Sequence, residues 1–224
     1  MQDAIMKSVR KANQFSRNAG AESADANCRM PSNTLDANVA NVTIGELLGR
    51  LEDFTSGLAG GPEMYPWASR FVMGLPLPSW QRGHTWSREQ DIRFIQSIWA
   101  GVDIGTYMVN DLCSAVPGVN GKHEHYRENS DILLDGQQRL TALQSYVLNE
   151  FPISDVTGKP RFWQDLPLIE RRRFSGTHFA RASVRSWDEV ELRRAYDLRA
   201  FGGTAHTEEE RALPSEPKSQ RPRM

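Results

Sequence analysis

Apolar residues recur at helical spacing in several separate stretches of the chain. The first follows a Thr-x-x-Glu capping box at residue 43, and a glycine-rich run over 56–62 ends it. A second follows a Ser-x-x-Gln box at residue 87 and stops at Gly101. In all, the pattern predicts five helices, over residues 43–54, 87–100 and 137–150 and beginning near residues 165 and 186.

Short apolar runs between these helices predict strands. Residues 105–110 and 131–134 are such runs, and residues 67–77 predict an extended segment that Pro76 confines to a sheet edge. Residues 113–130 are polar and predict a loop. About four short strands interleaved with helices that each bury one face indicate an α+β fold in a single domain.

Composition separates a central domain from two polar ends. Residues 1–40 are poor in aliphatic side chains and predict a mostly disordered arm, residues 41–204 the folded domain, and residues 205–224 a flexible tail. No stretch approaches the roughly 18 to 20 apolar residues that span a bilayer, and the N-terminus carries no secretory h-region. Two cysteines without a Cys-x-x-Cys pair fit a reducing compartment. We therefore expect a cytoplasmic protein that does not bind a membrane.

The charge is balanced overall but not locally. Lys and Arg number 27 against 28 Asp and Glu, a net charge of -1, which excludes a globally basic nucleic-acid coat. Residues 159–199 hold ten basic and six acidic residues, a local +4 that includes Arg171, Arg172 and Arg173. This stretch predicts either a face for the DNA backbone or a solvated helix that balances the acidic tail.

The strongest local signal is a buried strand that runs through a tight turn into a helix. The turn is Asp135-Gly136, and Gln137, Gln138 and Arg139 open the helix. The first amides of a helix lack internal partners and attract anions, and glycine lets a ligand approach the backbone. An arginine fork suits phosphate, and the carboxylate can hold a metal-bound water. The alternative is structural: Asp135 caps the helix and Arg139 pairs with it or with solvent.

A second polar pair lies between two tryptophans. Gln81 and Arg82 follow Pro78 and stand between Trp80 and Trp86. Arg82 could stack on an indole while it reaches for phosphate. Alternatively, both tryptophans belong to the core and Arg82 is a surface residue.

Taken together, the Pro-Ser-Trp-Gln-Arg segment, the helix after it and the Asp-Gly-Gln-Gln-Arg element resemble the N-terminal domain of GmrSD-type restriction endonucleases. The resemblance implies the ParB/sulfiredoxin-like fold, a small mixed sheet flanked by several helices. It is weaker over 196–203, where Leu198 and Ala200 stand in place of Arg and Asn.

The resemblance also implies a role in restriction and phage defence. Binding of a nucleoside triphosphate would fall to Gln81, Arg82, Gly136 and Arg139. Its hydrolysis would fall to Asp135, Gln137, Gln138 and Arg139, with Asp135 holding Mg2+. DNA, and a separate nuclease subunit or host protein, are the expected partners. The cell would be bacterial or phage-infected.

Two functions remain open at this stage. The first is a nucleoside triphosphate hydrolase that acts on or with DNA, with direct DNA cleavage as a variant. The second is a non-catalytic DNA- or protein-binding module, such as a phage-encoded factor that acts on host systems.

Overall fold

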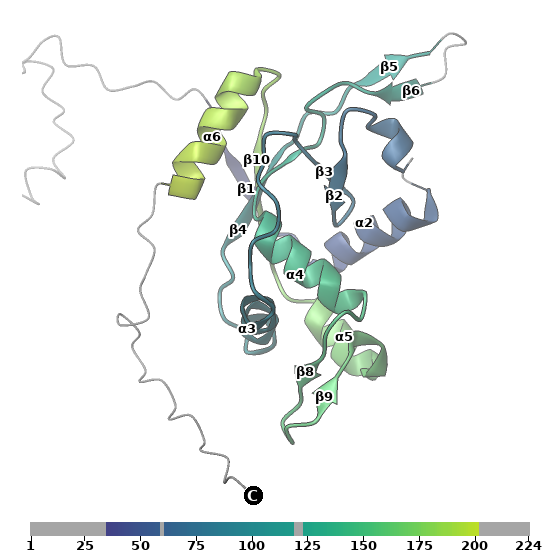
Figure 1. Cartoon of the computed structure of the whole chain (residues 1–224), viewed down its shortest axis with the longest axis vertical. Coiled ribbons are helices and arrows are strands. Elements are labelled where there is room, and N and C mark those ends of the chain that lie inside the picture. The colour runs from purple at the N-terminus through teal and green to yellow at the C-terminus, as the bar shows by residue number, and fades with distance from the viewer. Residues whose placement is uncertain (1–34, 59–60, 119–122, 202–224) are drawn as a thin grey trace, which may run out of the picture. The chain divides into compact units, whose positions relative to one another are not determined.

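The computed structural model describes residues 35–58, 61–118 and 123–201 (Figure 1). The arm predicted over residues 1–40 therefore lies outside the described residues except for its last six positions. The tail predicted over residues 205–224 lies wholly outside them.

Five α-helices are present in the described ranges, close to where the periodicity predicts them. Both predicted capping boxes form: the Thr43 amide donates to Glu46 Oε1 at 3.0 Å, and the Ser87 amide donates to Gln90 Oε1 at 2.8 Å. The helices are α2 (Ile44–Ser56), α3 (Arg88–Trp99), α4 (Gln137–Val147), α5 (Leu168–Ser175) and α6 (Glu189–Phe201), with 3-10 turns η1 (Pro62–Met64) and η2 (Trp163–Asp165).

A four-stranded mixed sheet with the order β1-β10-β4-β7 holds the domain together. Only the pair β10 and β4 is parallel, and the other two pairs are antiparallel. The strands are β1 (Asn38–Ala40), β4 (Thr106–Asn110), β7 (Leu133–Asp135) and β10 (Ala180–Val184). A mixed sheet with separate helices confirms the predicted α+β class.

Three two-stranded hairpins complete the described part. They are β2 (Arg70–Val72) with β3 (Leu75–Leu77), β5 (Ala115–Pro117) with β6 (His123–Tyr126), and β8 (Ile153–Ser154) with β9 (Pro160–Arg161). The polar loop predicted over 113–130 is thus a hairpin for part of its length. The extended segment over 67–77 folds back on itself at Met73 and Gly74, which both have positive φ.

Both faces of the sheet are covered by a core. Successive side chains of a strand point to opposite sides, so one strand contributes to both cores. Tyr107 and Val109 of β4 enter the larger core, with residues of α2, α3 and α4. Met108 between them enters a smaller core with Leu192 of α6. Helix α6 thus lies on the sheet face opposite the larger core, and Figure 1 shows it apart from the other four helices.

Candidate functional site

The N-terminus of α4 is open because glycine precedes it. Gly136 is the N-cap residue, has a φ of 98°, and provides no side-chain cap. A Cβ atom at this position would lie 2.6 Å from Tyr107 Cβ on the neighbouring strand, so the tight fit requires glycine. Asp135 does not cap the helix, contrary to the structural alternative. No acceptor among the described residues bonds the amides of Gln137, Gln138 and Arg139.

A cavity of about 250 Å³ lies at this helix end. Its wall contains every residue to which the sequence assigned nucleotide binding or hydrolysis, although Gln81 and Arg82 stand more than fifty positions before the others. The lining comprises Gln81, Arg82, Trp86, Asp135, Gly136, Gln137, Gln138, Arg139, Tyr196 and Arg199. The fold therefore joins the two sequence motifs into one cavity.

Asp135 is the only acidic side chain among the described residues of the lining, and it lies between two arginines. Arg139 Nη2 donates to Asp135 Oδ2 at 3.3 Å, and Arg199 Nε donates to the same oxygen at 3.0 Å. Arg82 adds a third guanidinium to the wall. Three guanidiniums against one carboxylate give the described part of the lining a formal charge of +2, which favours an anionic ligand.

Arg139 is fastened to the protein as well as to Asp135. Its Nη1 donates to the Ile104 carbonyl and its Nη2 to the Thr106 carbonyl, both at 2.8 Å. Its guanidinium also lies over the Phe179 ring, 5.6 Å from the centroid. Burial lowers the pKa of Arg139, and the charge of Asp135 opposes this effect. The Asp135–Arg139 pair of the structural alternative is therefore present, within a cavity that remains cationic.

The two glutamines of the motif have different surroundings. Gln138 Oε1 accepts from the amides of Thr85 and Trp86 at 2.8 and 3.2 Å, and its Nε2 donates to the Gly83 carbonyl at 3.0 Å. Gln138 thus fixes the 83–86 segment. Gln137 lines the cavity, and its carboxamide has no hydrogen-bond partner within the described ranges.

Backbone contacts also fix the Gln81-Arg82 segment. Gln81 is buried, and its Nε2 donates to the Leu134 carbonyl at 3.0 Å. Arg70 donates to the main-chain carbonyls of Gln81 and Arg82, the latter at 3.2 Å. The Arg82 side chain is exposed and has no ion-pair partner in the part of the chain that the structure describes. Its charge is therefore available to a ligand.

Arg82 does not stack on the ring of either neighbouring tryptophan in the described structure. Arg193 of α6 lies over the Trp80 ring, 5.3 Å from the centroid, and Trp80 also packs edge-on against Tyr196. Trp86 packs against Phe94 beside the larger core. Both tryptophans are half-buried and pack against the two cores without belonging to them, and Trp86 also lines the cavity.

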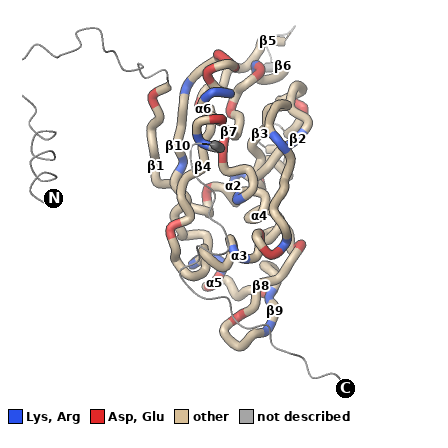
Figure 2. The backbone as a smooth tube through the Cα atoms, turned by 60° about the vertical axis from the view of Figure 1, so that its left-hand side comes forward, with Lys and Arg blue, Asp and Glu red and all other residues tan. Residues whose placement is uncertain are grey.

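The three arginines proposed for DNA lie on α5 and do not share one face, because consecutive helical residues are about 100° apart. Arg172 and Arg173 are exposed and Arg171 is half-buried. Arg173 pairs with Glu170 at 2.8 Å and lies over Trp99. Figure 2 shows basic and acidic positions interspersed over the elements. A role for these arginines in DNA binding remains a prediction.

A preformed metal cage is not found: the described residues hold no group of three or more His, Cys, Asp and Glu side chains. A magnesium ion commonly uses one or two carboxylates and completes its shell with waters and substrate phosphates. Asp135 alone fits that smaller demand. Its Oδ1 accepts no hydrogen bond from the described residues, whereas Oδ2 is held by the two arginines.

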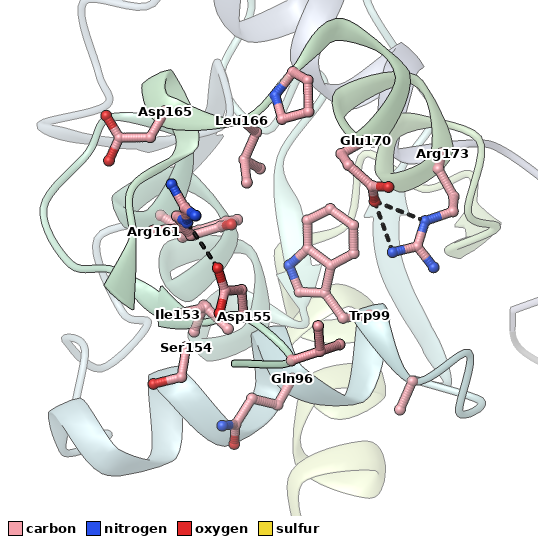
Figure 3. A pocket seen from close by; sticks show the side chains of 14 residues that line it. Gln96, Trp99, Ile153, Ser154, Asp155, Arg161, Asp165, Leu166, Glu170 and Arg173 are labelled. Atoms are coloured by element: carbon pink, nitrogen blue, oxygen red, sulfur yellow. Dashed lines mark hydrogen bonds and ion pairs between the residues drawn. The ribbon is translucent and has the colours of Figure 1, made fainter. Parts of the chain in front are cut away.

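A second cavity, of about 670 Å³, lies at the other end of α4. Trp99 and Leu166 give it a largely apolar wall (Figure 3), to which Tyr146 also belongs. Both of its arginines are paired within the wall, Arg161 with Asp155 and Arg173 with Glu170, each at 2.8 Å, and Asp165 adds an acidic side chain to the lining. Although it is the larger of the two cavities, its described lining offers no unpaired cation to a phosphate, so the smaller one is the candidate site.

Sequence reasoning missed Tyr196 and Arg199, the two residues that α6 brings to the cavity. The weak likeness over 196–203 drew attention to Leu198 and Ala200, but Arg199 between them carries the charge. A search for any arginine within residues 196–203, rather than for an arginine at one fixed position, would have identified Arg199.

None of the helices described is both long and apolar enough to cross a membrane. Fold and cavity together define an α+β domain with a cationic pocket at a helix N-terminus. A model of the family described as GmrSD restriction endonuclease, N-terminal domain, matches residues 70–220. The chain belongs to this family, as its motifs predict, and is thereby related to restriction endonucleases.

An uncharacterized protein of Methanocaldococcus jannaschii is 30% identical over 108 residues, which are 43% of this chain and 19% of that protein. The chain thus spans about a fifth of the length of that relative. No solved structure matches the chain.

Proposed function

We propose that the cavity at the N-terminus of α4 binds the phosphates of a nucleoside triphosphate and hydrolyses it, in a protein that acts on or with DNA. One observation carries the proposal. Three guanidiniums, three unbonded helix amides and a single carboxylate from three separate segments converge on one cavity. These are the components that phosphoryl transfer requires for binding and charge stabilisation.

The cavity has room for phosphates rather than for a whole nucleotide. Its 250 Å³ lies below the range of about 300–1,000 Å³ typical of sites for complete small ligands. The amides of residues 137–139 and the free Arg82 guanidinium would hold phosphate oxygens. The nucleoside would then extend beyond the walls that the described residues form.

The residues of the Asp-Gly-Gln-Gln-Arg element would divide the work. Asp135 would hold Mg2+, which when bound neutralises phosphate charge. Gln137 has a free carboxamide beside it and would orient the attacking water. Gln138 and Arg139 have most of their donors and acceptors committed to the protein, so they would position the segments around the ligand.

Phosphate release from Mg-ATP, Mg-GTP, Mg-CTP and Mg-UTP tests the proposal directly. We expect turnover of at least one nucleotide, lost in Asp135→Asn and in Gln137→Ala. Asp53→Asn is the matched control, because Asp53 is exposed and lies outside the cavity. If the wild-type protein released no phosphate from any of the four, with or without DNA, hydrolysis would be excluded.

The second candidate is a non-catalytic DNA- or protein-binding module. It is favoured by the ties of Arg139 and Arg199 to Asp135, which a purely structural role would also produce. This candidate predicts DNA binding that survives Asp135→Asn but weakens with salt and with neutralisation of Arg171, Arg172 and Arg173. Binding that ignores these arginines would remove α5 from the interface.

A further inference from the structure

Arg199 enters the cavity from α6, which no motif assigned to the site. Its Nη2 donates to the carbonyl and the hydroxyl of Thr106 at 3.1 and 2.9 Å, and its Nε donates to Asp135. The side chain is 33% exposed, against 21% for Arg139. Arg199 therefore contacts the protein on one side and faces the cavity on the other.

The two arginines that share Asp135 are not held equally. Arg139 is anchored at 2.8 Å to two main-chain carbonyls and covers an aromatic ring. The Nη1 atom of Arg199 has no acceptor among the described residues. The two N–H groups on Nη1 are therefore free to bind a ligand. Each guanidinium makes three hydrogen bonds to described residues, but only Arg139 also covers an aromatic ring, and Arg139 is the more buried of the two. Arg199 is therefore the one that a ligand can redirect more easily.

The C-terminal half of α6 depends on this polar contact. The helix is anchored to the smaller core by Leu192, which is fully buried, with Ala195 packed beside it. Further along, Leu198 is 67% exposed and contributes little apolar burial. Beyond Ala195, the described contacts of the helix with the domain are the packing of Tyr196 on Trp80 and the hydrogen bonds of Arg199.

We infer that Arg199 is a phosphate-binding residue that turns from Asp135 to the phosphates when a metal-bound triphosphate enters, and that α6 thereby responds to site occupancy. The inference rests on the proposed function. A divalent ion held by the free Asp135 Oδ1 would repel the guanidinium on Oδ2 and weaken its bond to the carboxylate, and the phosphate oxygens would offer the guanidinium a stronger, bidentate partner.

Isothermal titration of Mg2+-loaded inorganic triphosphate tests the role of Arg199. We expect Arg199→Ala to bind roughly tenfold to a hundredfold more weakly than wild type, the range for loss of a charge-assisted hydrogen bond. Arg199→Lys should fall between them, because it keeps the charge and loses the fork. The matched control is Arg194→Ala on the same helix, which removes the same charge outside the cavity and should stay within about twofold.

The outcomes separate this inference from the proposed function. No binding by wild type at any concentration overturns the proposed function and the inference with it. Binding by wild type that Arg199→Ala and Arg194→Ala reduce equally overturns only the inference, because the effect is then one of general charge.

Hydrogen–deuterium exchange of the wild-type protein covers the case in which Arg199→Ala loosens α6 by itself. We expect the ligand to change the protection of the 196–201 amides, while the amides around Leu192 stay constant. Unchanged protection of 196–201 with ligand bound would overturn the response of α6.

Discussion

Gln138 Oε1 lies 2.8 Å from the Thr85 amide nitrogen and thereby joins the first turn of α4 to the segment that follows Arg82. The residues are 53 positions apart in the chain. The position of Gln138 in a sequence motif at a helix N-terminus predicts a catalytic role. In the structure its hydrogen bonds hold the 83–86 segment against the first turn of α4, and so set the distance between the two segments that line the cavity.

Replacement of Gln138 should therefore act through the 83–86 segment. Gln138→Ala removes three hydrogen bonds, and we expect a loss of about 1–2 kcal/mol in the free energy of unfolding and weaker triphosphate binding. Gln138→Glu keeps the acceptor for Thr85 and should be milder. Urea unfolding and calorimetry measure both effects. Gln96→Ala, an exposed helical glutamine without a side-chain bond in the described ranges, should change neither.

Gly136 should tolerate no side chain. Gly136→Ala forces a Cβ to 2.6 Å from Tyr107 Cβ at a φ of 98°, so we expect a destabilisation of about 1–3 kcal/mol from the backbone conformation plus a cost for the contact. Gly158→Ala is the matched control, because Gly158 has a φ of 80° with open space around it. Equal losses in the two variants, measured by thermal unfolding, would show that the Tyr107 contact does not matter.

Leu192 should be the residue that holds α6 on the sheet. It is fully buried in the smaller core, so Leu192→Ala should cost about 2–5 kcal/mol and expose the α6 amides to hydrogen exchange. Val190 on the same helix is 72% exposed, and Val190→Ala should stay within about 0.5 kcal/mol. A small effect of Leu192→Ala on both unfolding and exchange would mean that polar contacts alone hold the helix.

Acid should weaken the β8–β9 hairpin through Asp155. Hydrogen bonds from Thr157 and Arg161 hold the pKa of this carboxyl well below its usual range. A depressed pKa means that the carboxylate stabilises the folded protein above about pH 3.9, the ordinary aspartate value, and that this contribution is lost as the pH falls further. Urea unfolding of wild type and Asp155→Asn should thus differ at pH 6 and converge toward pH 2. A constant difference, or an equal change in Asp53→Asn, would contradict this assignment.

The sequence was most informative where the structure is local. Helix periodicity and the two capping boxes depend on residues three or four apart, and both predicted boxes are present. The Asp135-Gly136 turn is likewise a property of adjacent residues. The convergence of Gln81 and Arg82 with that turn was expected only from a family resemblance, since periodicity holds no information on which segments meet.

The other parts of the fold and site could not be predicted from the sequence, because they depend on contacts between distant segments. Strand β10 has Arg181 and Ser183 among small residues, so it lacks the apolar run that predicts a strand, and it forms because β1 and β4 pair with it. Arg199 reaches Asp135 across 64 positions for the same reason: α6 packs on the sheet through Leu192. The hairpin within 113–130 is polar and gives no hydrophobic signal of its own.

The carbonyl oxygen of Thr106 accepts hydrogen bonds from both Arg139 and Arg199. Because this acceptor belongs to the main chain, an alanine scan would score position 106 only through its hydroxyl and overlook the atom that the two cations share. Substitution of Thr106 can therefore leave the hydrogen bonds of both arginines to this carbonyl in place. Semisynthesis with an ester in place of the 106–107 amide, which makes the carbonyl a poorer acceptor, would be needed to probe it.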